Sequence, residues 1–121
     1  MGTAKSFEEL RIWQQARALV KEIYQDFGEG SPCSRDFGFR DQIQRAGVSI
    51  MNNIAEGFER STDTQFRHLL DIAKGSCGEV RSMYYTAEDL RYTPPDVADH
   101  RRNAAKQISA GIAALMSHLK P

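Results

Sequence analysis

The chain lacks most of the features that would tie it to a particular chemistry or to a membrane. Only two of its 121 residues are cysteines, Cys33 and Cys77, and they do not have the spacing of metal ligands. No apolar run approaches the roughly 20 residues that a membrane-spanning helix needs. The N-terminal residues also lack the apolar core of a secretion signal. These absences predict a cytoplasmic protein whose cysteines stay reduced.

The sequence also lacks an excess of charge of either sign. It has 16 basic and 16 acidic residues, which give a formal net charge of zero. Proteins that bind nucleic acid strongly and without specificity usually carry a marked basic excess. The balance therefore argues against that class, although it leaves room for a local basic patch.

Catalytic and metal-binding motifs are missing as well. Helical bundles that hold two iron ions use Glu-x-x-His pairs, but the residues three positions before the histidines are Gln65, Val97 and Leu115. There is no glycine-rich phosphate loop, no His-Glu-x-x-His zinc motif and no nucleophile elbow. We therefore expect no enzyme, no metal and no cofactor.

What the sequence does contain is helical periodicity. Apolar residues recur at steps of three and four in four segments, and they predict helices over about 7–27, 38–59, 63–92 and 95–119. Each apolar stripe needs a partner to cover it, and the short connections favour antiparallel neighbours. We predict an all-α, antiparallel, up-down-up-down four-helix bundle that forms a single domain over residues 1–121. A three-helix core with one swapped or docked helix is the main alternative.

Polar residues mark the predicted helix ends. Ser6 begins a Ser-x-x-Glu capping box at the first helix, and Thr62 begins a Thr-x-x-Gln box at the third. Residues 93–96 end the third helix and start the fourth, because Thr93 can cap a helix whose first position is a proline.

A polar strip accompanies the apolar stripe of the second helix. Its members recur at steps of three and four: Gln42, Arg45, Ser49, Asn53, Glu56 and Arg60. The third helix carries Gly75 and Gly78 around Ser76, and glycine costs roughly 1 kcal/mol inside a helix relative to alanine. Two glycines so close predict that the backbone of the second helix approaches there.

Such an approach would place Ser76 and Glu79 of the third helix near Ser49, Asn53 and Glu56 of the second. Three interpretations of these polar residues remain open. They are a hydrogen-bonded seam that fixes the register of the two helices, a ligand or RNA site, or a solvated face.

Basic residues are scattered rather than clustered. The candidate nucleic-acid contacts are Arg45, Arg60, Arg101, Arg102 and Lys106. The last three form the densest basic group, in a segment (94–121) with four basic and two acidic residues. This group is either a phosphate-facing patch or an ordinary solvated helix face.

Three stretches resemble the 23S rRNA intervening-sequence proteins, a family of bacterial four-helix bundles. They are FEELRIWQQA at 7–16, QIQRA followed by SIMNNIAEG between 42 and 57, and IAKGSCGE at 72–79. The resemblance covers about residues 7–93, and the last helix matches only in pattern. It implies a ring-like homo-oligomer, a pentamer, with nucleic acid as a partner. It also implies a relation to the accessory protein of the reverse transcriptase in diversity-generating retroelements.

Taken together, these observations predict a non-enzymatic homo-oligomeric bundle that interacts with RNA or with an RNA-handling partner. The alternative is a protein-interaction scaffold, such as a reverse-transcriptase accessory subunit, that does not touch nucleic acid. An enzyme that uses Asn53, Glu56 and Glu79 is a third, weaker interpretation.

Overall fold

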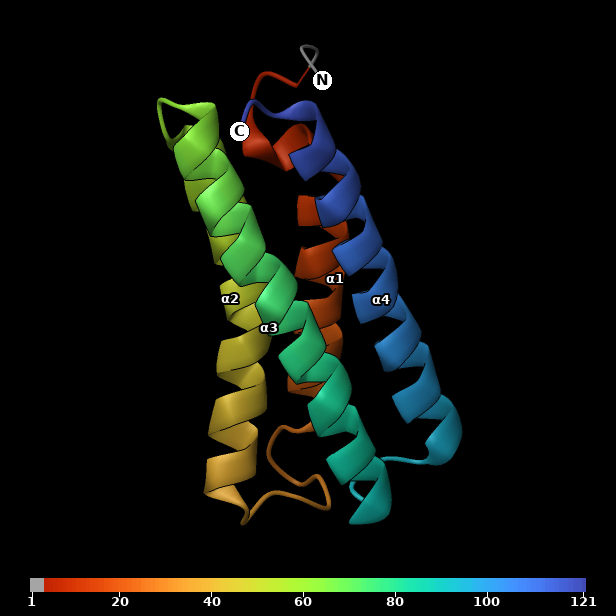
Figure 1. Ribbon diagram of the computed structural model, residues 1–121. Helices are drawn as coiled ribbons and strands as arrows, with labels where there is room; N and C mark the ends of the chain where they lie inside the picture. Colours follow the sequence, from red (N-terminus) through yellow and green to blue (C-terminus); the bar gives the residue numbers. More distant parts are fainter. Residues whose placement is uncertain (1–3) are drawn as a thin grey trace.

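The computed structural model describes residues 4–121, which contain helices and no strand. A short 3-10 turn, η1 (Phe7–Glu9), precedes α1 (Arg11–Asp26), α2 (Phe37–Glu59), α3 (Asp63–Asp89) and α4 (Pro95–His118). Successive helices alternate in direction, and the start of α1 lies at the same end of the bundle as the end of α4 (Figure 1). The predicted all-α antiparallel bundle is confirmed. The predicted domain began at residue 1, and residues 1–3 lie outside the described part.

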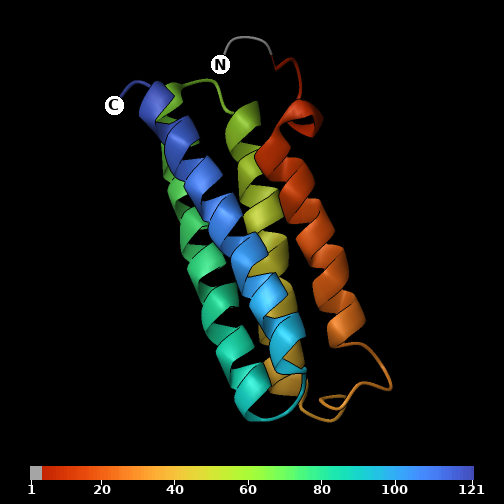
Figure 2. The same cartoon turned by 90° about the vertical axis from the view of Figure 1, so that its right-hand side faces the viewer.

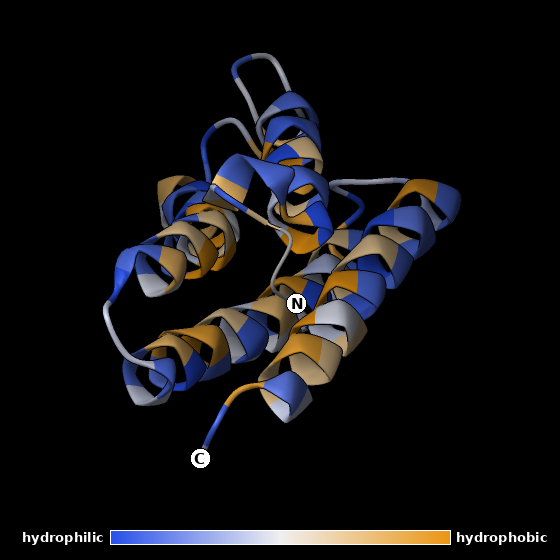
Figure 3. Ribbon diagram, turned by 90° about the horizontal axis from the view of Figure 1, so that it is seen from above, coloured by the Kyte–Doolittle hydropathy of each residue, from blue (hydrophilic) through white to orange (hydrophobic). Residues whose placement is uncertain are grey.

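The four helices form a closed square in which α1 and α3 are diagonal. α1 packs against α2 and α4, and α3 packs against the same two helices (Figures 1 and 2). Hydrophobic segments gather towards the interior when the bundle is seen from above (Figure 3). Fully buried side chains from every helix meet there, among them Ile23, Ile50, Tyr84 and Ile112. None of the described helices combines the length and the apolar character that crossing a bilayer requires.

The beginning of the first helix differs from the prediction. Residues 7–9 form the separate turn η1, and Leu10 takes an extended conformation before α1 starts. The side chain of Ser6 caps no backbone N–H, so the predicted capping box is wrong. The break has a packing reason, because it lets Leu10 be buried while the Phe7 ring packs edge-on against Trp13 at 5.1 Å.

The ends of the later helices follow the predicted chemistry with small shifts. Thr62 caps α3, where its Oγ1 accepts a hydrogen bond from the Gln65 backbone N–H at 3.2 Å. α3 ends at Asp89, three residues earlier than predicted, because the chain turns through Arg91 at φ +61°. The cap of α4 is Pro94 rather than Thr93, whose side chain is buried instead.

Close helix contacts occur at different glycines from those predicted. An added Cβ at Gly75 or Gly78 would meet nothing within 4 Å, so no backbone approaches α3 there. A Cβ at Gly57 of α2 would lie 2.8 Å from the Phe66 ring on α3, and one at Gly47 would lie 2.7 Å from Ile23 on α1. The glycines that permit tight packing are therefore on α2 and on α4, where a Cβ at Gly111 would lie 2.6 Å from Ile12, and those on α3 lie open to solvent.

Candidate functional site

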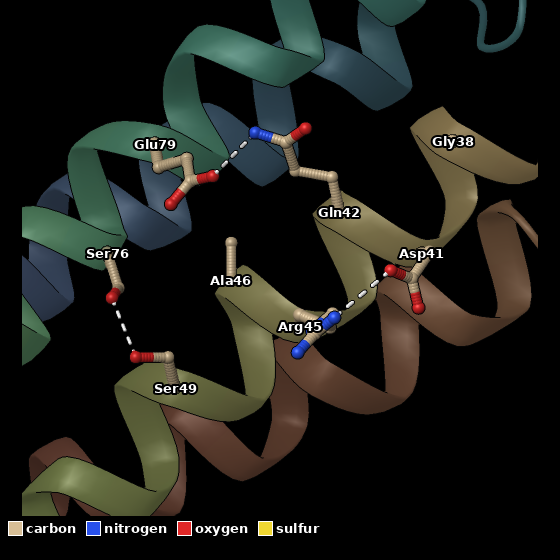
Figure 4. Close-up of a pocket in the computed structure, with 8 residues that line it drawn as sticks. All are labelled: Gly38, Asp41, Gln42, Arg45, Ala46, Ser49, Ser76 and Glu79. Atoms are coloured by element: carbon tan, nitrogen blue, oxygen red, sulfur yellow. Dashed lines mark hydrogen bonds and ion pairs between the residues drawn. The ribbon is translucent and has the colours of Figure 1, made fainter.

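A polar groove runs between α2 and α3 on the outside of the bundle. It encloses about 470 Å³. Figure 4 shows the side chains that line it: Gly38, Asp41, Gln42, Arg45, Ala46, Ser49, Ser76 and Glu79. Three of the five residues of the predicted seam line this groove. Ser49 on α2 and Ser76 on α3 lie together at one end of it, and Glu79 lies further along α3. The groove is open along its length, so its outer residues are in contact with solvent.

Hydrogen bonds across this groove, and within its α2 wall, hold the polar side chains in place. The hydroxyl oxygens of Ser49 and Ser76 lie 2.8 Å apart (Figure 4). The Asn53 amide donates to the Ser49 carbonyl oxygen at 2.8 Å and to its hydroxyl oxygen at 3.0 Å. Further along, the Gln42 amide donates to the Glu79 carboxylate at 3.0 Å. These polar groups satisfy one another, as buried and half-buried polar groups generally do.

Glu56 does not join this seam. Its carboxylate pairs with Arg60 one turn along the same helix, and both side chains are about half exposed. The structure thus brings Ser49, Asn53 and Ser76 together and leaves Glu56 on the solvent side of α2. Glu79 occupies the outer part of the groove, where its partner is Gln42.

The groove offers little for bond-making chemistry. No histidine lines it, so neither serine hydroxyl has an imidazole base beside it. The neighbouring Cys77 is fully buried, and burial raises the pKa of its thiol to about 12, which keeps it protonated and unreactive. Within residues 4–121, no three histidine, cysteine or carboxylate side chains gather closely enough to bind a metal ion.

The most extensive charged cluster joins α1 to α4. The Arg101 guanidinium donates from Nε to the Asp26 carboxylate at 2.8 Å and from Nη1 to the Glu22 carboxylate at 3.0 Å. The buried hydroxyl of Tyr84, on α3, also donates to Asp26 at 2.7 Å. The hydrogen bond to Asp26 raises the pKa of Arg101 further above its ordinary value. Only 14 % of the Arg101 side chain and 10 % of the Asp26 side chain are exposed.

Arg102 is also turned into the bundle. Its guanidinium lies 3.0 Å from the Glu88 carboxylate and 4.1 Å from the centre of the Tyr85 ring, and 12 % of the side chain is exposed. The predicted basic group on α4 therefore does not form a free patch. Its two arginines already bind carboxylates within the chain, and only Lys106 of that group is exposed.

The two other arginines of the predicted contact set are exposed but paired. Arg45 lies 3.4 Å from Asp41, and Arg60 pairs with Glu56, each one helical turn away. Sequence reasoning overlooked a different group, Arg11, Arg17 and Lys21, which are all exposed on α1. The signal was present, because none of these three belongs to the apolar stripe of the first helix.

Comparison with solved structures supports the fold. A crystal structure from Bacteroides thetaiotaomicron VPI-5482, described as a protein of unknown function from the S23 ribosomal protein family, superposes with a TM-score of 0.79. It shares 18 % sequence identity with this chain, and the match covers 87 % of this chain and 97 % of that one. No curated protein matches the chain at a significant level.

Comparison with protein families gives a match over nearly the whole bundle. The sequence model of the family described as "23S rRNA-intervening sequence protein" matches residues 8–114, which run from η1 to the last turns of α4. The chain belongs to the 23S rRNA-intervening sequence protein family.

Proposed function

We propose that the chain is a bacterial, cytoplasmic, non-enzymatic protein that works as a homo-oligomer and binds RNA. The observation that carries this proposal is membership of a family described by an intervening sequence of 23S rRNA. The geometry agrees with a role played by the outer surface. The core is filled by apolar side chains, and the seam between α2 and α3 is closed by its own hydrogen bonds.

The zero net charge is compatible with RNA binding because internal ion pairs remove cations and carboxylates together from some faces of the bundle and leave unpaired cations on others. Glu22 and Asp26 bind Arg101, Glu88 binds Arg102, and Glu56 binds Arg60. An approaching phosphate responds to the unpaired cations on the face that it meets, and not to the net charge of the whole chain.

A labelled RNA hairpin, titrated with the full chain at low and at physiological salt, tests the proposal. We expect salt-sensitive binding, weaker for a DNA duplex of the same sequence. No binding even at low salt would reject the RNA role. Light scattering of the same sample tests the oligomer, for which we propose five chains in a ring. A mass equal to one chain would reject it.

A second function, that of a protein-interaction scaffold, is favoured by two exposed apolar side chains. Phe37 is 71 % exposed at the start of α2, and Leu90 is 53 % exposed just after α3, at the same end of the bundle. Exposed apolar patches often mark protein contacts. A reverse transcriptase of a diversity-generating retroelement is the partner we would test, in a binding assay with Phe37→Ser as the control. An oligomer that binds this partner and no RNA would support the scaffold.

A further inference from the structure

The charged residues of α1 differ in whether they have partners within the chain. Its carboxylates, Glu22 and Asp26, turn towards α4 and are held there by Arg101. Its cations, Arg11, Arg17 and Lys21, are exposed. None of the three forms an ion pair with a carboxylate in residues 4–121, whereas the candidate arginines of α2 and α4 all do. The outer face of α1 therefore presents positive charge that nothing within the described chain neutralises.

Helical geometry gives this charge a defined spacing. The rise of 1.5 Å per residue separates Arg11 from Lys21 by about 15 Å along the axis, with Arg17 between them. At 3.6 residues per turn, the three side chains leave the helix within about a third of its circumference. A strand of B-form DNA carries one phosphate for about every 3.4 Å of helix axis, and the phosphates of an RNA strand are likewise only a few ångströms apart. The row is thus long enough to face several successive phosphates of one strand.

The other residues on this face suit a nucleic acid better than an apolar protein surface. Gln25 is exposed and offers an amide group for sugar and phosphate oxygens, whereas the amide of Gln14 donates to the Glu8 carbonyl oxygen at 2.8 Å. Tyr24, 47 % exposed, is an aromatic ring on which an unpaired base could stack. Arg17 lies over the Trp13 ring, 5.7 Å from its centre, which supports the guanidinium from below.

We propose that the outer face of α1, formed by Arg11, Arg17, Lys21 and Tyr24, is the surface that contacts the phosphate backbone of RNA. This inference rests on the RNA-binding function proposed above. A second copy of the chain is a weaker candidate for the occupant. Stable protein interfaces have an apolar or aromatic centre. Among the described residues of α1, Tyr24 is the only large apolar or aromatic side chain that is exposed, and the other exposed side chains of this kind lie on α2, on α3 or just after α3.

Three triple variants of the full chain, each losing three positive charges, test this surface with the RNA hairpin. The test variant is Arg11→Gln with Arg17→Gln and Lys21→Gln. The matched control is Arg35→Gln with Lys74→Gln and Lys120→Gln, which are exposed on other parts of the chain. The competing variant, Arg45→Gln with Arg60→Gln and Lys106→Gln, removes the exposed contacts that the sequence suggested. Glutamine keeps a helix propensity close to that of lysine and arginine.

We expect the test variant to bind more weakly and to lower the slope of log affinity against log salt by about 3, which is about one unit per lost phosphate contact. The control should keep the wild-type slope to within about one unit. If the wild type binds and the test variant binds equally well, or if only the competing variant weakens, the α1 surface is rejected while RNA binding stands. If the wild type binds no RNA, the proposed function itself fails.

Two measurements keep the result unambiguous. Circular dichroism and light scattering of each variant check that helix content and the number of chains are unchanged. A test variant that folds but loses the wild-type assembly would show that α1 is an interface between copies, which overturns the proposal. If the triple variant does not fold, Lys21→Glu alone replaces it, because this exposed side chain has no partner in residues 4–121. Unchanged RNA binding by Lys21→Glu would also reject the surface.

Discussion

The arginines of α4 and the cations of α1 show two different uses of positive charge. The side chains of Arg101 and Arg102 are almost completely buried and bind carboxylates of α1 and α3. Arg11, Arg17 and Lys21 are exposed and have no such partner among residues 4–121. The α4 pair is adjacent in the sequence, yet adjacent residues point about 100° apart on a helix. The difference teaches that the direction of a side chain, and not local density in the sequence, decides whether a charge reaches solvent.

The sharpest way to break this comparison is to remove one charge from each group. Arg101→Met leaves Glu22 and Asp26 without their cation, and Asp26 keeps only the hydrogen bond from Tyr84. Breaking a buried ion pair from one side is strongly destabilising, and we expect a loss of about 3 kcal/mol in the free energy of unfolding. Urea denaturation followed by circular dichroism measures it.

The matched change on α1 is Lys21→Met, which should alter the same free energy by no more than about 0.5 kcal/mol. Adding Asp26→Asn to Arg101→Met should recover part of the loss, because it removes one of the stranded charges. Equal stability changes for Arg101→Met and Lys21→Met would show that the two groups are not different in kind.

Glycines extend the comparison between covered and open parts of the surface. Gly111→Ala on α4 would bring a Cβ within 2.6 Å of the branched Ile12 side chain, and we expect a loss of roughly 1–3 kcal/mol. Gly75→Ala and Gly78→Ala meet empty space on α3, so each should gain up to about 1 kcal/mol from helix propensity. Thermal unfolding of the three variants checks the signs. Destabilisation by Gly75→Ala would mean that another molecule occupies that face.

Alkaline pH should weaken the packing of the covered interior. Burial raises the pKa of the Cys77 thiol from 9.0 to about 12, and burial together with the bond to Asp26 raises that of Tyr84. The unfolded chain loses these protons first, so stability is full below about pH 9 and falls as the pH rises towards 12. From Cys77 alone we expect a loss of about 1 kcal/mol between about pH 8 and about pH 10.

The variant Cys77→Ala provides the control for this prediction, measured by urea denaturation at both pH values. It should be less stable at neutral pH because it leaves a small cavity. Its stability should nevertheless depend less on alkaline pH than that of the wild type. An identical pH dependence in the two proteins would contradict the assignment to the buried thiol.

Much of the fold could be predicted from the sequence because four apolar stripes leave few alternatives. The start of α1 could not, since the extended conformation at Leu10 depends on the packing of Phe7 against Trp13. Sequence reasoning placed Ser49 beside Ser76 correctly, although the close backbone approach at Gly75 and Gly78 from which it argued does not occur. It could not show that space over Gly75 stays open, because that depends on how far apart α2 and α3 lie.

Sequence reasoning about the charged residues was less successful for a physical reason. Whether Arg101 is free depends on the antiparallel register of α1 and α4, which places Glu22 and Asp26 beside it. That register is a tertiary property that no single helix encodes. The cations of α1 also lie outside the apolar stripe of their helix, but they stay exposed because no carboxylate of a neighbouring helix pairs with them in residues 4–121.

The most direct test of the account is lysine acetylation of the full chain with and without saturating RNA hairpin, read out by peptide mass spectrometry. We expect RNA to slow acetylation of Lys21 on α1 and to leave the rate at Lys74 on α3 unchanged. An unchanged rate at Lys21, with protection of Lys106 on α4 instead, would contradict it.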